Sequence, residues 1–292
     1  EPMKSLKQII NRYIRSAAIV MALVILVVIA FAEILIEQGR VEDTAAGTFV
    51  RLEQIIEENE NELKQVKEKY DKTCLHDAEA IAFLLQKDIK MVVAACGTVS
   101  STLPREISAN LPVPYLDIVL PAAQQACAMT SRGRIGVVGT NATLRSNAFG
   151  KAIHNIRADV QVYGNPCPLL VHLVENGLVQ QENPITRLTV QMYLEPLMKE
   201  QIDTLILGCT HYPLLYDIFN ELLDYQVTLI DPGRCAAGSV RDLLMKNGQL
   251  AQRQRQGITE YNVTDETESF NRTASIFLGE QVKGAVNRIE LG

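Results

Sequence analysis

The sequence predicts an α/β fold, with doubly wound parallel sheet structure following a membrane-spanning helix and a charged helix. Three observations lead to this fold class. Hydrophobic residues make up 47% of the 292 residues and charged residues 21%, which is typical of a globular chain. The run from Ser16 to Ala32 carries no charge. Beyond residue 80, short apolar runs alternate with stretches of helical periodicity, an order typical of parallel sheets with crossover helices.

The charge and cysteine content exclude several classes of protein. The chain has 28 Lys and Arg against 34 Asp and Glu, a net charge of −6. A nucleic-acid binder is not expected, because neutralising phosphates needs a basic face. The 6 Cys include no CxxC pair, which argues against a disulfide scaffold and a zinc ribbon.

The N-terminal segment has the pattern of a membrane anchor. We assign residues 1–15 to a basic tail and 16–36 to a transmembrane helix, because the apolar run reaches the lower limit for a span. Basic residues precede the run and acidic residues follow it, which favours an N-terminus in the cytoplasm. A cleaved signal peptide ending at Ala30–Ala32 and a buried helix of a globular domain are the alternatives.

Residues 37–79 are expected to form a charged helix or short coiled coil. Residues 51–72 contain neither Gly nor Pro, and apolar residues recur there at heptad spacing with one Asn in the seam. A single amphipathic helix would give the same pattern. The seam residues are Leu52, Ile56, Asn59, Leu63, Val66 and Tyr70. The order of basic tail, span and charged helix resembles the N-terminal anchor of bacterial membrane signalling proteins.

The chain beyond residue 80 is expected to form a parallel sheet covered by helices on both faces. Its continuous apolar runs are typical of strands buried on both sides. The predicted strands are Met91–Ala95, Ile135–Val138, Val160–Tyr163, Thr204–Leu207 and Val227–Ile230. The predicted helices are Asn147–Ile156, Leu169–Glu175, Arg187–Lys199 and Leu214–Leu223. Ligands of such sheets bind beyond the carboxyl ends of the strands.

Two of these strand ends lead directly into a cysteine. Cys96 follows the first predicted strand, and Cys209 follows Thr204–Leu207 after a single glycine. We expect each thiol to lie at a helix N-terminus, where free N–H groups and the helix dipole lower the pKa of a thiol. The alternative is that both are small buried hydrophobic residues.

Two thiols on opposite faces of an amino acid are suited to inverting its Cα. One thiolate removes the proton as a base, and the opposite thiol returns a proton as an acid. Neither a GxGxxG fingerprint nor a Walker loop occurs in the sequence. We therefore expect no cofactor and no metal.

The sequence around both cysteines resembles glutamate racemase, in the aspartate/glutamate racemase superfamily. The second cysteine segment, Gly208–Leu215, reads GCTHYPLL and is similar to that family's signature. The first cysteine segment, Ala94–Ser101, reads AACGTVSS and is similar to its first cysteine motif. Further similarity occurs at Ile135–Thr140, Pro166–Pro168 and Leu173–Gly177, so the resemblance covers about residues 80–292.

The resemblance implies cofactor-independent interconversion of L- and D-glutamate, which supplies D-glutamate for peptidoglycan. Cys96 and Cys209 would be the two acid/base residues, and His211 would support Cys209 as a proton partner. The substrate site would be formed by Gly97, Thr98, Thr140, Thr143, Thr210 and Glu175. Thr140 and Thr143 could instead cap a helix. Glu175 could instead be a solvated residue at the end of a helix.

The resemblance also implies a two-domain enzyme whose opening part is replaced here. We assign 80–113 with 213–292 to a first domain and 114–212 to a second. The family's Asp-Ser-Gly and Pro-Tyr-Gly motifs do not occur before Met91, and Gly97 stands where the family usually has Asn. We therefore expect two unrelated segments joined near residues 76–88, a truncated first domain and impaired catalysis.

The alternative function is a membrane-anchored sensor or binding protein that holds an acidic amino acid without catalysis. As written, the chain would be membrane-anchored through residues 16–36, whereas the racemase part alone would be cytoplasmic. The expected partners are L- and D-glutamate, the membrane and a second copy in a homodimer.

Overall fold

The computed structural model describes residues 74–252 and 257–291. The described residues divide into two compact units, and each is described by itself. The smaller contains residues 74–86 and Pro104–Asn110. Residues 74–84 are helical there, and Arg105–Ser108 forms the single-turn helix α4. The larger unit contains Lys87–Leu103 and the described chain from Leu111 onward.

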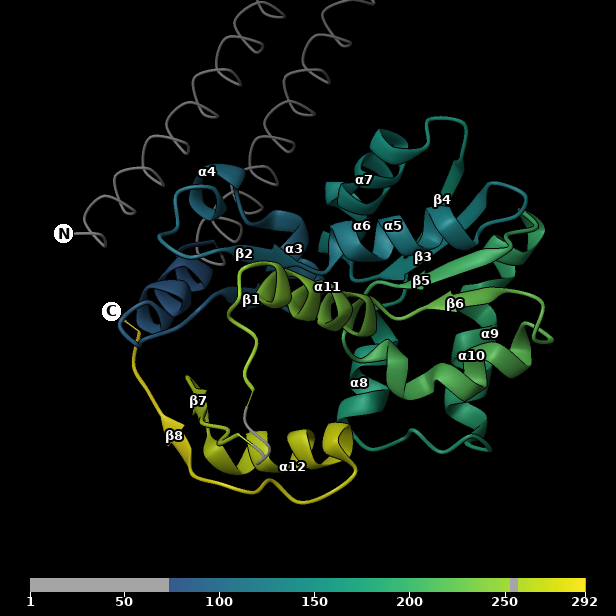
Figure 1. Cartoon of the computed structure of the whole chain (residues 1–292). Coiled ribbons are helices and arrows are strands. Elements are labelled where there is room, and N and C mark those ends of the chain that lie inside the picture. The colour runs from purple at the N-terminus through teal and green to yellow at the C-terminus, as the bar shows by residue number, and fades with distance from the viewer. Residues whose placement is uncertain (1–73, 253–256, 292) are drawn as a thin grey trace, which may run out of the picture. The chain divides into compact units, whose positions relative to one another are not determined.

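A four-stranded parallel sheet is the centre of the larger unit (Figure 1). Its strands are β3 (Arg134–Gly139), β4 (Gln161–Pro166), β5 (Thr204–Leu207) and β6 (Thr228–Ile230), in the order β4-β3-β5-β6. The four apolar runs predicted as strands here are thus confirmed, as is the parallel α/β class. The strand β6 lies beyond residue 212, where the sequence predicted the end of the second domain, and joins the same sheet.

Helices cover both faces of this sheet, which explains why its strands are apolar without alternation. On one face, Ile135 and Val137 belong to a core that includes residues of α5 (Val119–Met129) and α7 (Ala148–Ile156).

On the other face, Val138, Leu205 and Leu207 belong to a second core. The other residues of this second core come mainly from helices that lie on the same side of the sheet in Figure 1. These are α8 (Pro168–Glu175), α9 (Pro184–Lys199), the 3-10 helix η1 (Tyr212–Leu215) and α10 (Tyr216–Leu222). The helices predicted from residue 147 to 223 are therefore confirmed, with the last one divided between η1 and α10.

A second, two-stranded parallel sheet carries the first cysteine segment. It pairs β1 (Val92–Ala94) with β2 (Tyr115–Asp117), and β1 leads into α3 (Gly97–Thr102). The strand β3 leads likewise into α6 (Asn141–Ser146), and β6 into α11 (Pro232–Lys246). Three strand ends are thus followed closely by helix N-termini, which is the arrangement expected of a doubly wound fold.

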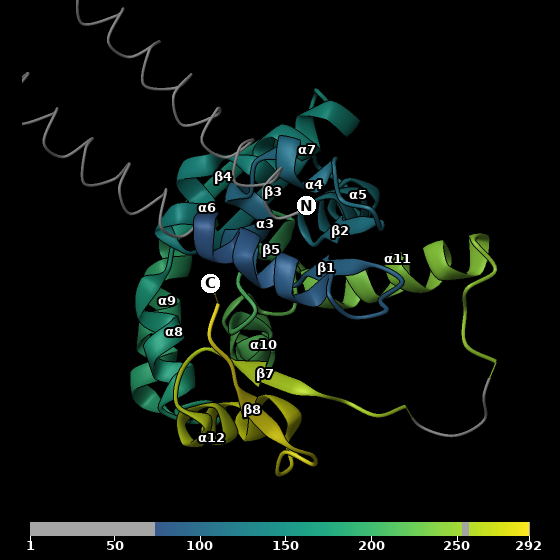
Figure 2. The same cartoon turned by 90° about the vertical axis from the view of Figure 1, so that its left-hand side faces the viewer.

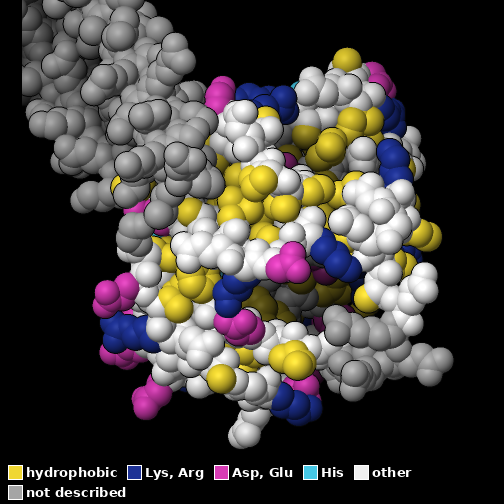
Figure 3. Space-filling view, turned by 60° about the vertical axis from the view of Figure 1, so that its left-hand side comes forward, with side chains coloured by type: hydrophobic (Ala, Val, Ile, Leu, Met, Phe, Trp, Pro, Cys, Tyr) yellow, Lys and Arg dark blue, Asp and Glu magenta, His cyan; other side chains and the backbone are white. Residues whose placement is uncertain are grey.

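The C-terminal part consists of β7 (Tyr261–Val263), α12 (Thr267–Leu278) and β8 (Val286–Arg288) (Figure 2). The strands β7 and β8 pair in parallel, and the rings of Tyr261 and Phe270 lie 5.5 Å apart. Gly279 ends α12 with a φ of 66°, a conformation that favours glycine. Figure 3 shows one face of the molecule, on which apolar side chains lie among charged ones, as is usual for a globular surface.

Several predictions concern residues outside the described part of the chain. The basic tail of residues 1–15, the transmembrane helix of 16–36 and most of the charged helix of 37–79 lie there. Among the described residues, none of the helices combines the length and the apolar character that crossing a membrane requires.

Candidate functional site

The first cysteine lies where the sequence predicted it, between a strand and a helix. Cys96 follows β1 and is the N-cap residue of α3, with an extended backbone conformation. Its side chain is exposed, whereas the next residue, Gly97, is buried. Cys96 therefore presents its thiol to a small molecule approaching the carboxyl end of β1.

The second cysteine has a different environment from the one predicted. Cys209 is only 7% exposed and belongs to the core beneath the sheet, and His211 is the N-cap residue of η1. Burial raises the pKa of Cys209 to about 11, although a hydrogen bond from the backbone of His211 acts in the opposite direction. The expected lowering at a helix N-terminus is wrong for Cys209, because the cost of desolvating a thiolate exceeds this stabilisation.

The two cysteine segments meet through their backbones. A Cβ added to Gly97 would lie 2.1 Å from the carbonyl oxygen of Gly208, so no larger residue fits without a shift of the backbone. Cys96 is also among the groups that raise the pKa of Cys209, which places the thiols within electrostatic range of each other. The glycine at position 97, which stands where the family usually has Asn, allows this close approach.

Three predicted substrate-binding threonines form one cluster beside this contact. The Oγ1 atoms of Thr98 and Thr140 lie 3.0 Å apart, and those of Thr140 and Thr143 are also 3.0 Å apart. Thr143 donates its backbone N–H to Thr140 Oγ1, so Thr140 caps α6, as the alternative reading proposed. A Cβ at Gly97 would lie 3.6 Å from Thr143 Oγ1. The cluster thus joins the first cysteine segment to the end of β3.

A histidine and a carboxylate support the second cysteine. The Nδ1 atom of His211 lies 3.6 Å from the Sγ of Cys209, and its Nε2 lies 3.2 Å from Oε1 of Glu175. Thr210 Oγ1 lies 3.4 Å from the same Nδ1. Glu175 ends α8, and its side chain is 45% exposed, so it is both a helix-end residue and a partner of the histidine. All nine predicted site residues are therefore joined in one group.

Three neighbours of Cys209 and His211 were not predicted to act in the site. Phe277 of α12 packs against His211 with ring centroids 5.2 Å apart and nearly perpendicular planes. Cys167 is buried with a raised pKa, mainly through desolvation and partly through Cys209. The Tyr212 hydroxyl donates to the carbonyl of Cys167 at 2.8 Å. The Pro-Cys-Pro motif makes Cys167 conspicuous in the sequence. The contact between the rings of Phe277 and His211 depends on tertiary structure alone.

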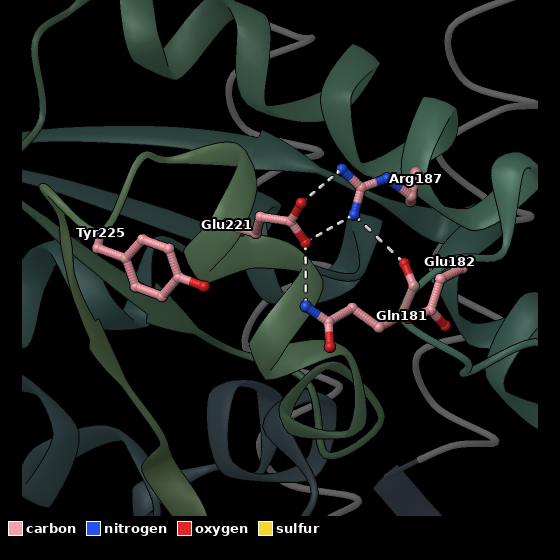
Figure 4. Close-up of a pocket in the computed structure, with 5 residues that line it drawn as sticks. All are labelled: Gln181, Glu182, Arg187, Glu221 and Tyr225. Atoms are coloured by element: carbon pink, nitrogen blue, oxygen red, sulfur yellow. Dashed lines mark hydrogen bonds and ion pairs between the residues drawn. The ribbon is translucent and has the colours of Figure 1, made fainter.

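A pocket of about 540 Å³ at α9 and α10 contains none of the predicted site residues (Figure 4). The Nη1 and Nη2 atoms of Arg187 contact the carboxylate of Glu221 at 2.8 and 3.1 Å, and Gln181 donates to it at 3.0 Å. The hydrogen bond from Arg187 lowers the pKa of Glu221. Because these charged groups satisfy one another, the pocket does not compete with the cysteine site as a candidate.

Comparison with known proteins identifies similar sequences. Residues 42–240 match the family described as Asp/Glu/Hydantoin racemase. The chain is 37% identical to the glutamate racemase of Geobacter metallireducens, over 74% of this chain and 79% of that protein. It is 35% identical to the glutamate racemase of Aquifex aeolicus, over 74% of this chain and 77% of that protein. The family match begins before residue 80 and crosses residues 76–88, so the similarity is not confined to 80–292 as predicted.

Solved structures of glutamate racemases are similar as well. The isoform RacE1 from Bacillus anthracis superposes with a TM-score of 0.71 at 33% identity, covering 76% of this chain and 82% of that one. The enzyme of Francisella tularensis, solved in complex with D-glutamate, gives a TM-score of 0.67 at 28% identity. That match covers 76% of this chain and 81% of the other.

Proposed function

The chain belongs to the Asp/Glu/Hydantoin racemase family, and on that premise we propose that it interconverts L- and D-glutamate through Cys96 and Cys209. The observation that carries this proposal is the backbone contact between the two cysteine segments at Gly97 and Gly208. It joins an exposed thiol and a buried thiol at the ends of two strands. Glutamate is proposed as substrate because the similar enzymes are glutamate racemases.

The proposed reaction moves one proton on each face of the substrate. One cysteine, as thiolate, takes the proton from Cα, and the bonding electron pair stays on the substrate next to the α-carboxylate. The other cysteine, as thiol, donates a proton to the opposite face of Cα and becomes a thiolate. Reversal of these roles converts the product back, so neither direction consumes a cofactor.

The buried thiol begins this reaction in its protonated form. Because burial raises the pKa of Cys209 to about 11, Cys209 rests as the protonated thiol and is ready to act as the acid. To act as the base it must first lose its proton, and His211 Nδ1 at 3.6 Å is the nearest recipient. Glu175 at Nε2 would stabilise the positive charge that the imidazole gains.

The substrate is proposed to bind where the threonine cluster meets the cysteine segments. The hydroxyls of Thr98 and Thr140, the backbone of Gly97 and the exposed Thr210 supply hydrogen-bonding groups there. Thr143 is only 1% exposed, so we assign it to supporting Thr140. The D-glutamate product would serve peptidoglycan synthesis.

We propose that turnover is slow, because the two cysteines are unequally supported. Among the described residues, no carboxylate is hydrogen-bonded to Cys96, whereas Cys209 has both His211 and Glu175 behind it. General acid–base groups act best when their pKa is matched to the working pH. Cys96 therefore lacks, among the described residues, a hydrogen-bonded carboxylate comparable to the pair beside Cys209.

Racemisation in deuterium oxide tests the proposed function. Purified chain is mixed separately with L- and D-glutamate, and NMR follows loss of the Cα proton while circular dichroism follows inversion. We expect deuterium at Cα of the inverted product in both directions. Cys209→Ala should lower the rate by roughly 10²- to 10⁴-fold, the usual contribution of an acid–base group.

The same experiment separates the racemase from the binding protein. Cys235→Ala, a thiol outside the site, serves as the matched control and should retain the wild-type rate. If calorimetry shows glutamate binding while the wild type keeps its Cα proton, the chain is a binding protein and the racemase proposal is wrong.

A further inference from the structure

The C-terminal helix α12 reaches the proposed site through one aromatic side chain. Phe277 and His211 have ring centroids 5.2 Å apart and planes inclined at 83°, the T-shaped arrangement that aromatic rings favour. The two residues lie far apart in the chain, so the contact exists only because α12 packs there. Phe277 is 37% exposed, which means that this packing leaves part of its ring in solvent.

A second residue near the end of α12 lies close to the same region. A Cβ added to Gly177, just beyond the end of α8, would lie 3.9 Å from the Cδ1 atom of Ile276. Figures 1 and 2 both show α12 beside this end of α8. Ile276 thus lies near the end of α8 that carries Glu175, and its neighbour Phe277 contacts the histidine. On its other side, α12 is attached to β7 through the rings of Tyr261 and Phe270.

The orientation of the His211 ring matters because its two nitrogens have different partners. Nδ1 lies 3.6 Å from Cys209 Sγ, and Nε2 lies 3.2 Å from Glu175 Oε1. A rotation of the ring about its Cβ–Cγ bond would break both contacts together. Glu175 alone is a weak restraint, since its side chain is 45% exposed and exposed ion pairs contribute little.

We propose that Phe277 is a positioning residue, which holds the His211 imidazole between Cys209 and Glu175. This inference rests on the proposed racemase function. The ring of Phe277 touches neither cysteine in the described contacts and acts through the histidine alone. The consequence is that proton transfer on the Cys209 face depends on the docking of the C-terminal helix.

Kinetic isotope effects test this role in a way that general damage to the fold would not reproduce. Phe277→Leu keeps an apolar side chain but removes the ring. We expect kcat/KM to fall about 10-fold, part of the 10²- to 10⁴-fold that a positioned acid–base group supplies. With Cα-deuterated substrates, the isotope effect should rise for the enantiomer that Cys209 deprotonates and fall for the other one.

Two matched variants accompany this measurement. Phe277→Tyr retains the ring and should restore the wild-type rates and isotope effects. Leu278→Ala removes an exposed apolar side chain next to it on α12 and should change neither. If Phe277→Leu lowers the rate but leaves both isotope effects at wild-type values, Phe277 only supports the fold and the proposal is overturned.

A spectroscopic measurement keeps this inference separate from the proposed function. The ¹⁵N signals of the His211 ring, assigned by their loss in His211→Asn, report its environment without any turnover. We expect them to shift in Phe277→Leu and not in Leu278→Ala. A wild type that racemises nothing would sink the proposed function alone, whereas unchanged ring signals in Phe277→Leu would sink the positioning role alone.

Discussion

The two cysteine segments follow parallel strands in similar ways, yet their thiols have opposite environments. Cys96 is exposed at the start of the short helix α3, and no described carboxylate is hydrogen-bonded to it. Cys209 is buried in the core beneath the sheet, with His211 and Glu175 behind it. Position at a strand end therefore does not decide the chemistry of a thiol. Its burial and its neighbouring groups decide that chemistry.

This difference would give the two cysteines unequal roles in the proposed two-thiol reaction. In the proposed reaction, the exposed thiol of Cys96 is open to solvent, whereas the buried thiol of Cys209 would depend on the imidazole at 3.6 Å. A raised pKa suits a group that donates a proton and hinders one that accepts it. Four measurements test whether the two thiols differ in this way, and we expect the greatest difference in their reactivity.

Alkylation by iodoacetamide should separate the two thiols most strongly. With a pKa of about 11, Cys209 is roughly 0.1% ionised at pH 8, against roughly a tenth for a thiol with the ordinary pKa of 9.0. We expect Cys209 to react about 100-fold more slowly than a free model thiol, and well after Cys96. Peptide mass spectrometry over time measures both rates. Equal rates at the two sites would show that Cys209 is neither buried nor protonated.

Substitution of Gly97 should damage both sides together. Gly97→Ala places a Cβ 2.1 Å from the Gly208 carbonyl, and the required backbone shift should destabilise the fold by about 1–3 kcal/mol. We expect kcat/KM to fall about 10- to 100-fold, since small displacements of reacting groups are costly. Urea unfolding and racemisation assays measure the two effects.

Gly238→Ala is the matched control, because a Cβ there meets nothing within 4 Å. It lies inside α11 and should be neutral or slightly stabilising. Wild-type stability and activity in Gly97→Ala would contradict the close backbone contact.

Alkaline pH should weaken the fold through Cys209. Its folded pKa of about 11 exceeds the ordinary 9.0, so the unfolded chain loses this proton first as the pH rises. The stabilisation is therefore complete below about pH 9 and is lost as the pH rises through 11. Between pH 8.5 and 10.5, the stability of the wild type relative to Cys209→Ala should fall by about 1–2 kcal/mol, measured by urea unfolding. Parallel pH curves would show that the thiol is not desolvated.

Removal of the charge behind the histidine should have the smallest effect. Glu175→Gln keeps a hydrogen-bonding group at His211 Nε2 but loses the negative charge. Because Glu175 is 45% exposed, we expect a cost of about 0.5–1 kcal/mol, a two- to five-fold fall in kcat/KM. Glu195→Gln, in an exposed pair with Lys199 on α9, is the control. A loss as large as that of Cys209→Ala would make Glu175 a proton carrier in its own right.

Much of this arrangement could be predicted from the sequence. The apolar runs at residues 135–138 and 204–207 predicted β3 and β5, because strands buried on both faces leave an unbroken local signal. The position of each cysteine just beyond a strand followed from the apolar runs at residues 91–95 and 204–207. The three-residue strand β2 has no comparable signal and was not predicted.

The rest depends on tertiary packing. The upward shift of the Cys209 pKa could not be predicted, because the sequence around Cys209 indicates a turn but does not show the core that surrounds it. The contact between Phe277 and His211 joins distant parts of the chain. The reason for glycine at position 97 became visible only when Gly208 was placed against it.

The meeting of Gly97 and Gly208 has a consequence for how substrate selectivity can change. Where side chains separate two catalytic groups, a larger or smaller side chain alters the gap by small steps. Here two bare backbones touch, and no side chain lies between them to be trimmed or enlarged. The contact between the two backbones therefore fixes the separation of the two cysteine segments. Accepting a different amino acid as substrate would then require substitutions at the edge of the site. Side-chain substitutions between the two cysteine segments cannot change their separation gradually.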